Sequence, residues 1–256
     1  MNDFFNLHNK VAIVTGGNGG LGKAIARGLA SVGADIVIAA RNEAKTVAAV
    51  SEIHEESDGQ VVGITVDVKQ ANQIRDLAAK TLEVFGHIDI LVNNAGINIR
   101  KLPQDYKASE WDEVIDINLR GAFLCSQAVY PAMRTAGGGK IINIGSMLSI
   151  FGGANLAPYG TSKGGIVQLT KSLSVAWAPD NIQVNAILPG YINTDLTGRA
   201  KKEMPGFEEY VLGRSPTGRW GEPEDLSGTA IFLASRAADF VTGVALPVDG
   251  GFSVMV

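Results

Sequence analysis

Hydrophobic residues are spaced in two different ways along this chain. Short runs rich in Val, Ile and Ala are separated by longer stretches in which apolar residues recur every three or four positions. The first pattern is typical of strands buried on both faces, and the second is typical of amphipathic helices. The strand-like runs lie at 11–15, 36–40, 61–68, 88–92, 140–144, 184–188 and 244–248. The sequence therefore predicts about seven strands separated by helices.

The helical stretches determine how these strands are joined. The apolar positions of two of the predicted helices are Leu21, Ile25, Leu29 and Val32, followed later by Ile74, Leu77, Leu82 and Phe85. A helix-length connection between neighbouring strands produces a parallel pair, and such crossovers are right-handed. We predict an α/β fold, a doubly wound Rossmann-type parallel sheet with helices on both faces.

The alternation of strands and helices continues along nearly the whole chain, and we find no repeat or Pro-rich linker. A chain of 256 residues is within the range of one large α/β domain, so we predict that residues 1–256 form a single domain. The stretch at about 193–220 interrupts the alternation with six Gly and Pro residues. We expect it to be a mobile insert on the substrate side.

Composition excludes several classes of partner. The net charge is −4 and the isoelectric point is near 5.4, so we expect no nucleic-acid or anionic-membrane binding. No apolar run approaches the roughly 18 residues of a membrane span, and the first ten residues lack the apolar core of a signal peptide. The expected location is the cytoplasm.

Cys125 is the only cysteine, which excludes an intrachain disulfide and leaves no ligands for a cysteine-based metal site. It lies in an apolar stretch, where a buried helix residue is the better interpretation than a nucleophile. We predict no metal centre.

A glycine-rich loop, Thr15-Gly-Gly-Asn-Gly-Gly-Leu-Gly22, follows the first predicted strand and begins the first predicted helix. This is the setting of a dinucleotide site. Gly16 allows a tight turn, while Gly20 and Gly22 allow backbone to approach a pyrophosphate at the positive end of the helix dipole. Asn18 and Leu21 are expected to line the same site. The alternative is a flexible loop without a ligand.

The end of the second strand indicates which dinucleotide is bound. A carboxylate there would accept the ribose hydroxyls of NAD, but the run ends in Ala40, Arg41 and Asn42. Arg41 can pair with a 2′-phosphate, so we expect NADP(H), with NAD(H) still possible. The alternative is a solvated arginine. Asp67, followed by Val68, would bind the adenine amino group or cap the next helix.

Tyr159 and Lys163 carry the candidate chemistry. Four residues apart on a helix, they would share one face, and the ammonium would lower the pKa of the phenol toward neutrality. Tyr159 would then be a usable acid or base. Ser146 lies thirteen residues earlier and would hydrogen-bond a carbonyl oxygen. The alternative is that Tyr159 and Lys163 are simply an i,i+4 side-chain pair on a solvated helix face.

Together these residues resemble the short-chain dehydrogenase/reductase family from Lys10 to Phe252. The glycine motif at 15–22, Asn93-Asn94-Ala95-Gly96 after the fourth strand, Pro189-Gly190 with Thr194, and Val248-Asp-Gly-Gly251 all occur in order. The family's catalytic tetrad maps onto Asn118, Ser146, Tyr159 and Lys163.

The resemblance implies a hydride transfer at C4 of nicotinamide, with Tyr159 moving the proton and Ser146 orienting the oxygen. Lys163 would bind the nicotinamide ribose, and Asn118 would hold a water linked to Lys163. The resemblance also implies a homotetramer. Further cofactor contacts are expected from Asn94, Ala95, Gly96, Pro189, Gly190, Ile192 and Thr194.

The sequence thus predicts an NADP(H)-dependent oxidoreductase acting on a secondary alcohol or its ketone. Within the family it resembles gluconate and 2-deoxygluconate dehydrogenases, so a sugar acid or polyol is the expected substrate, and Arg100 would hold its carboxylate. A 3-oxoacyl-carrier reductase is one alternative. A noncatalytic nucleotide-binding sensor or scaffold is another.

Overall fold

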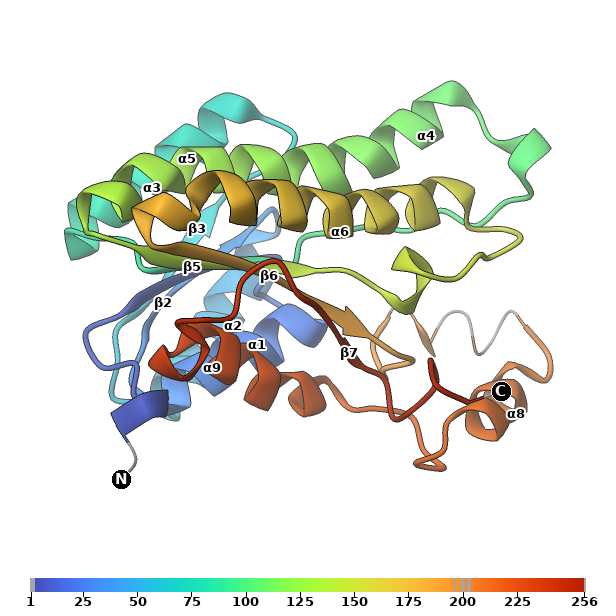
Figure 1. Ribbon diagram of the computed structural model, residues 1–256. Coiled ribbons are helices and arrows are strands. Elements are labelled where there is room, and N and C mark those ends of the chain that lie inside the picture. The colour runs from blue at the N-terminus through green and yellow to red at the C-terminus, as the bar shows by residue number, and fades with distance from the viewer. Residues whose placement is uncertain (1–2, 196, 199–200, 202–203, 256) are drawn as a thin grey trace.

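Seven parallel strands form one sheet at the centre of the molecule, with helices on both faces (Figure 1). The computed structural model describes residues 3–195, 197–198, 201 and 204–255. The strand order is β3-β2-β1-β4-β5-β6-β7, with every neighbouring pair parallel. The strands are β1 (Val11–Thr15), β2 (Asp35–Ala40), β3 (Val61–Thr65), β4 (Ile90–Asn93), β5 (Gly139–Ile144), β6 (Ile182–Pro189) and β7 (Ala245–Val248).

The helices form two layers, one on each face of the sheet. Figure 1 shows α3 (Ala71–Phe85), α4 (Ala108–Ile115), α5 (Gly121–Thr135) and α6 (Ala157–Trp177) on one face. The other face carries α1 (Gly20–Ser31), α2 (Glu43–Glu55) and α9 (Ser227–Ala234). The short helix α8 (Phe207–Arg214) lies at one end of the sheet, beside the C-terminal residues (Figure 1). The prediction of a doubly wound Rossmann-type sheet is confirmed.

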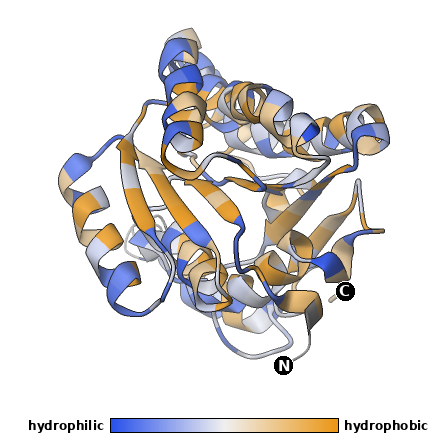
Figure 2. Ribbon diagram, turned by 90° about the vertical axis from the view of Figure 1, so that its left-hand side faces the viewer, coloured by the Kyte–Doolittle hydropathy of each residue, from blue (hydrophilic) through white to orange (hydrophobic). Residues whose placement is uncertain are grey.

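Alternation along the central strands divides the core into two clusters. In β1, Ala12 and Val14 belong to the cluster beneath α1 and α9, whereas Val11 and Ile13 belong to the cluster beneath α3 and α5. Successive side chains of a strand point to opposite faces, so a continuously apolar strand fills both clusters. Figure 2 shows the apolar strands enclosed between helices whose outer surfaces are hydrophilic.

The predicted elements are present, with small differences in their ends. The strand expected at 61–68 ends at Thr65, and the one expected from 88 begins at Ile90. The predicted apolar face of α3 is also shifted, because Leu82 is exposed while Ala78 and Thr81 are buried. Ala78 and Thr81 follow Ile74 at helical spacing, so small residues complete the buried stripe.

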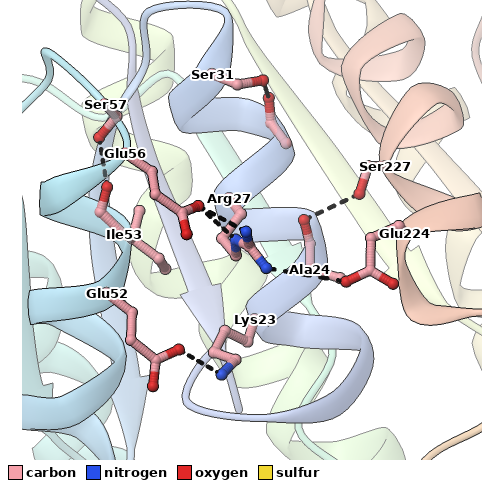
Figure 3. Close-up of polar contacts among 11 residues, drawn as sticks. Lys23, Ala24, Arg27, Ser31, Glu52, Ile53, Glu56, Ser57, Glu224 and Ser227 are labelled. Atoms are coloured by element: carbon pink, nitrogen blue, oxygen red, sulfur yellow. Dashed lines mark hydrogen bonds and ion pairs between the residues drawn. The ribbon is translucent and has the colours of Figure 1, made fainter.

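Helix α1 is held in place by contacts on two sides, drawn in Figure 3. Lys23 Nζ lies 2.6 Å from Glu52 Oε2 on α2, and Arg27 Nη2 lies 2.7 Å from Glu56 Oε2. On the opposite side, Ser227 Oγ donates to the carbonyl oxygen of Ala24 at 2.9 Å. Exposed ion pairs contribute little stability individually. Together with the Ser227 hydrogen bond, however, they join α1 to α2 on one side and to α9 on the other.

Cys125 is buried in α5, as predicted, and burial raises the pKa of its thiol to about 12. Within the described ranges, no helix is long and apolar enough to cross a membrane.

Candidate active site

A cavity of about 1420 Å³ opens at the carboxyl ends of the parallel strands. Its wall includes residues at or just after the ends of five strands: Ala40 in β2, Val66 after β3, Asn94 after β4, Ile144 in β5 and Pro189 in β6. Ligands of open α/β sheets bind at this edge, outside the carboxyl ends of the strands. The topology therefore brings residues from most of the chain to one place.

The glycine loop after β1 is fixed by Asn94. The Asn94 side-chain amide donates to the carbonyl oxygens of Thr15 at 3.0 Å and Gly16 at 3.1 Å. The hydroxyl of Thr15 accepts from the backbone N–H of Asn94 and of Ala95. Gly16 and Gly20 have φ angles of +64° and +50°, in the left-handed region that glycine adopts freely. This geometry turns the loop and leaves its backbone facing the cavity.

Gly22 has a different role from the one that we predicted. It does not line the cavity, although Gly16, Gly20 and Leu21 do. A Cβ atom at position 22 would collide with Asn94 Nδ2 and the carbonyl oxygen of Gly16. The missing side chain thus allows α1 to pack beneath the loop, rather than allowing a ligand to approach position 22.

The part of the cavity where we predicted the adenosine half of a dinucleotide is lined by polar and positively charged residues. Asn42 caps α2 by accepting the backbone N–H of Lys45 at 2.9 Å, and Asn18 Nδ2 donates to the carbonyl oxygen of Asn42 at 3.3 Å. Arg41 is exposed beside them and lines the cavity. Lys45 also lines it and was missed in the sequence, although its position four residues after Arg41 is a usable signal.

Asp67 lies at the same end and does not cap the following helix. Its Oδ1 accepts the backbone N–H of Lys69 at 3.0 Å, whereas α3 begins at Ala71 with Gln70 before it. The helix-cap alternative is therefore wrong. Asp67 and Val68 both line the cavity, as a contact with adenine requires.

Ser146, Tyr159 and Lys163 meet in the middle of the cavity wall. Ser146 follows β5 and accepts the backbone N–H of Leu148 at 3.2 Å. Tyr159 and Lys163 lie one turn apart in α6, and Lys163 Nζ is 5.7 Å from the centroid of the Tyr159 ring. Lys163 Nζ donates to the carbonyl oxygen of Ile144 at 2.7 Å, which fixes the ammonium beneath the site.

The pKa of Tyr159 is shifted in the direction opposite to our prediction. Burial raises it above its usual value, while a hydrogen bond with Ser146 and the charge of Arg100 oppose that rise. Burial dominates because the charged phenolate loses more hydration than the neutral phenol. Burial also lowers the pKa of Lys163 to about 8. Tyr159 is consequently a protonated phenol at neutral pH.

Asn118 lies behind the cavity rather than in its wall. It belongs to η3 (Asp116–Arg120), a single π turn between α4 and α5. Its side chain accepts from the backbone N–H of Ile97 at 2.8 Å and donates to Ile97's carbonyl oxygen at 2.9 Å and to Ser162 Oγ at 3.0 Å. Isolated π turns are frequent at functional sites. Asn118 thus joins the segment after β4 to the helix carrying Tyr159.

The other predicted cofactor residues line the cavity together. They are Asn94, Ala95, Gly96, Pro189, Gly190, Ile192 and Thr194. Gly190 is required by packing, because a Cβ atom there would lie 2.6 Å from Asp249 Cα.

The residues that line the rest of the cavity were only partly predicted. Arg100 lines it and its Nη1 lies 3.4 Å from Met204 Sδ. Tyr191, Arg214 and Phe252 also line it and were missed. They come from separate segments, so no local pattern in the sequence indicates that they meet.

This fold, with a glycine loop at the switch between β1 and β4 and a Ser, Tyr and Lys grouped in the wall, defines a dinucleotide-dependent oxidoreductase. The comparisons with known proteins agree. A family model described as Enoyl-(Acyl carrier protein) reductase matches residues 16–253. The chain belongs to the short-chain dehydrogenase/reductase family, which confirms the resemblance seen in the sequence.

Several relatives are similar over their full length. The chain is 41% identical over 252 residues to 2-dehydro-3-deoxy-D-gluconate 5-dehydrogenase of Bacillus subtilis (strain 168), with 98% of each chain covered. It is 42% identical over 257 residues to 5-keto-D-gluconate 5-reductase of Escherichia coli (strain K12), with 100% of each covered. A crystal structure of a gluconate 5-dehydrogenase from Burkholderia cenocepacia J2315 in complex with NADP and tartrate has a TM-score of 0.94 and 40% identity, covering 99% of both chains.

Proposed function

We propose that this protein is an NADP(H)-dependent oxidoreductase that interconverts a secondary alcohol and a ketone on a sugar acid of the gluconate type. The observation that carries the proposal is the meeting of Ser146, Tyr159 and Lys163 in a cavity that also contains Arg41 and Arg100. The names of the full-length relatives, all acting on gluconate derivatives, support the same substrate class.

The residues present fit a nicotinamide dinucleotide phosphate. Gly16 and Gly20 expose loop backbone at the N-terminal end of α1, where phosphate groups are favoured. Arg41 offers a guanidinium for the 2′-phosphate, and β2 does not end in a carboxylate that would repel it. A solved gluconate 5-dehydrogenase relative bound to NADP supports this choice. NAD(H) remains the weaker alternative.

When bound, NADPH supplies the hydride for ketone reduction. Tyr159, protonated because burial raises its pKa, donates its proton to the oxygen of the developing alcohol. Ser146 hydrogen-bonds and orients that oxygen. Lys163 places a positive charge beneath the phenol and is available to the nicotinamide ribose. Asn118 holds α6 in place through its hydrogen bond to Ser162. The family resemblance further implies that a water molecule binds near Asn118.

At the substrate end we propose that Arg100 contacts the anionic substrate. Its charge acts on the Tyr159 hydroxyl, so it lies near the reacting oxygen. We also propose that the insert at about 193–220 moves during turnover. Met204 and Phe207 from this insert line the cavity, while residues 196, 199–200 and 202–203 of the insert lie outside the described residues.

We infer further that the whole chain acts as one domain within a homotetramer in the cytoplasm. The exposed apolar side chains of Val175, Phe240 and Val254 support an interface, because a monomer would leave them in water. A single buried cysteine requires no oxidising compartment.

A panel of ketones with NADPH, followed by nicotinamide absorbance, tests the function. We expect 5-keto-D-gluconate and related keto sugar acids to be reduced with higher kcat/KM than neutral ketoses. Preference for long 3-oxoacyl thioesters would favour a 3-oxoacyl-carrier reductase instead. Tight NADPH binding with no turnover of any ketone or alcohol would favour a sensor or scaffold.

A further inference from the structure

Two arginines face the substrate end of the cavity without a carboxylate to balance them. Arg100 and Arg214 both line the cavity, and among the described residues neither has an Asp or Glu oxygen within ion-pair distance. The Nε atom of Arg214 is buried and has no hydrogen-bond partner among the residues that the structure describes. A buried N–H donor without a partner is costly, and a bound anion that accepts from it would remove that cost.

Arg214 is held in a fixed position. It lies at the end of α8, its guanidinium carbon is 5.1 Å from the centroid of the Phe252 ring, and its Nη2 is 3.5 Å from the carbonyl oxygen of Met255. A guanidinium packed on an aromatic ring keeps its planar donors available at their free edge.

Tyr191 stands beside it as part of an aromatic wall. Its ring packs edge-on against Phe207, Trp220 and Phe252, with centroids 5.1 to 5.7 Å apart. Tyr191 lines the cavity, and its hydroxyl group forms no hydrogen bond with the described residues, although the Arg214 charge acts on its pKa, which burial raises. The wall therefore presents one phenol hydroxyl close to the Arg214 guanidinium.

The two arginines contact different parts of the cavity wall. Arg100 lies beside Met204, whereas Arg214 packs on the Phe252 ring. Burial raises the pKa of Tyr191, and the charges of both arginines oppose that rise. The cavity thus has a second cationic point besides Arg100.

We propose that Arg214 and the Tyr191 hydroxyl bind the substrate's carboxylate at the end of the molecule opposite the reacting carbonyl. This inference rests on the proposed function, in which the substrate is a sugar acid. Arg100 would then be left to the hydroxyl groups near the reacting carbon. A substrate whose carboxylate lies several carbons from its ketone can bind at both ends of the cavity, whereas a neutral ketose can bind at only one.

Kinetics on a matched pair of substrates tests the assignment. Arg214→Met removes the charge and keeps an unbranched side chain over Phe252. With 5-keto-D-gluconate we expect KM to rise about tenfold to a hundredfold, the equivalent of about 1.5–3 kcal/mol for a charged hydrogen bond, with kcat little changed. With the uncharged amide of the same keto acid, we expect less than a twofold change. Equal losses on both substrates would overturn the proposal.

Two further variants separate recognition from packing. Tyr191→Phe keeps the aromatic wall and removes only the hydroxyl, so it should raise KM for the acid and leave the amide unaffected. Arg75→Met, an exposed arginine on α3, is the matched control and should change neither substrate. A Tyr191→Phe enzyme with unaltered KM for the acid would remove that hydroxyl from the site.

A binding measurement distinguishes this proposal from the proposed function. Malonate should raise the melting temperature of the NADPH-loaded wild-type protein, and the neutral malonamide should not. We expect the malonate effect to disappear in Arg214→Met and to persist in Arg75→Met. If no keto sugar acid is reduced but this pattern holds, the function fails and the anion site stands. An equal malonate effect in Arg214→Met and wild type would overturn the anion site.

Discussion

At Tyr159, burial and hydrogen bonding act on one phenol in opposite directions. The net effect is a raised pKa, which keeps the proton on the residue that we propose donates it during ketone reduction. Tyr159→Phe deletes that proton and preserves the ring. We expect turnover to fall by at least about 100-fold, the usual loss for a general acid, with NADPH affinity retained. Stopped-flow reduction with a parallel NADPH titration measures both, and near-normal turnover would exclude Tyr159 from the proton transfer.

Lys163 makes protein stability depend on pH through its buried amine. Its folded-state pKa of about 8 is below the ordinary value of 10.5. Between these two values the unfolded chain binds a proton that the folded chain does not, so the free energy of unfolding contributed by Lys163 rises with pH. This pH dependence reflects a cost of burying the ammonium, about 3.5 kcal/mol at most, at about 1.4 kcal/mol per pKa unit. The cost is present in full below pH 8 and is gone above pH 10.5.

Comparing wild type with Lys163→Met by urea unfolding at several pH values isolates this effect. The difference in unfolding free energy should shift in favour of wild type between pH 8 and pH 10. A difference independent of pH would show that the amine is not depressed in the folded protein.

Arg41 is expected to set the choice of cofactor. A charge-assisted contact with the 2′-phosphate is worth about 1.5–3 kcal/mol, or roughly a tenfold to hundredfold preference for NADPH over NADH. Ala40→Asp combined with Arg41→Ile removes the attraction and adds repulsion, so the order of the two dissociation constants should reverse. Fluorescence titration at moderate salt measures them. Tighter binding of NADH by the unmodified protein would leave Arg41 as a solvated arginine.

The position of candidate residues in the cavity was predictable where the chain carries them in a short pattern. Tyr159 and Lys163 are four positions apart, and Arg41 directly follows a strand, so local spacing was enough. Arg214 and Tyr191 were not predictable, because their roles depend on Phe252, which comes from a distant part of the chain. The direction of the Tyr159 shift also required the structure, since burial is a property of the packed fold.

At the scale of elements, the junction of β1, the glycine loop and α1 depends on Gly22. Gly22→Ala would force a Cβ atom against the side chain of Asn94 and the backbone of Gly16. Overpacking of this kind costs about 1–3 kcal/mol, and displacing Asn94 would also weaken cofactor binding. Chemical denaturation and an NADPH titration measure the two effects.

Gly228→Ala in α9 is the matched control, because a Cβ atom there meets nothing within 4 Å. That change should be neutral or stabilising by up to about 1 kcal/mol, since alanine favours the helix. If Gly22→Ala proved as stable as Gly228→Ala, the loop would be more adaptable than its contacts imply.

The strands were predictable because they are continuous apolar runs, and the helices α1 and α3 because their apolar residues recur every three or four positions. The ends of these elements and the exact buried face of α3 were less predictable. Leu82 was assigned to the buried face of α3, yet Thr81 takes that place by bonding its hydroxyl to the carbonyl oxygen of Leu77. A hydroxyl satisfied within its own helix can be buried, and the hydrophobic pattern alone does not reveal this.

For the whole molecule, the edge of the sheet at β7 leads to a prediction on assembly. β7 pairs only with β6, and Leu246 and Pro247 on it are exposed. Light scattering at micromolar concentration should give about four times 26.9 kDa. Leu246→Lys places a charge on this edge and should lower the measured mass. Val47→Lys on α2, at a more exposed apolar position, is the control and should leave it unchanged. A wild-type mass near 26.9 kDa would contradict the homotetramer.

The single π turn at 116–120 has a consequence for the length of the chain itself. A regular helix would run from α4 into α5 if one residue of this turn were deleted, and its backbone hydrogen bonds would become uniform. The same deletion would rotate everything before it by roughly 100° about the helix axis, which would carry Asn118 away from Ile97 and Ser162. A regular helix and the Asn118 hydrogen bonds to Ile97 and Ser162 are therefore mutually exclusive here. The extra residue makes the helix locally irregular at the point where Asn118 contacts α6.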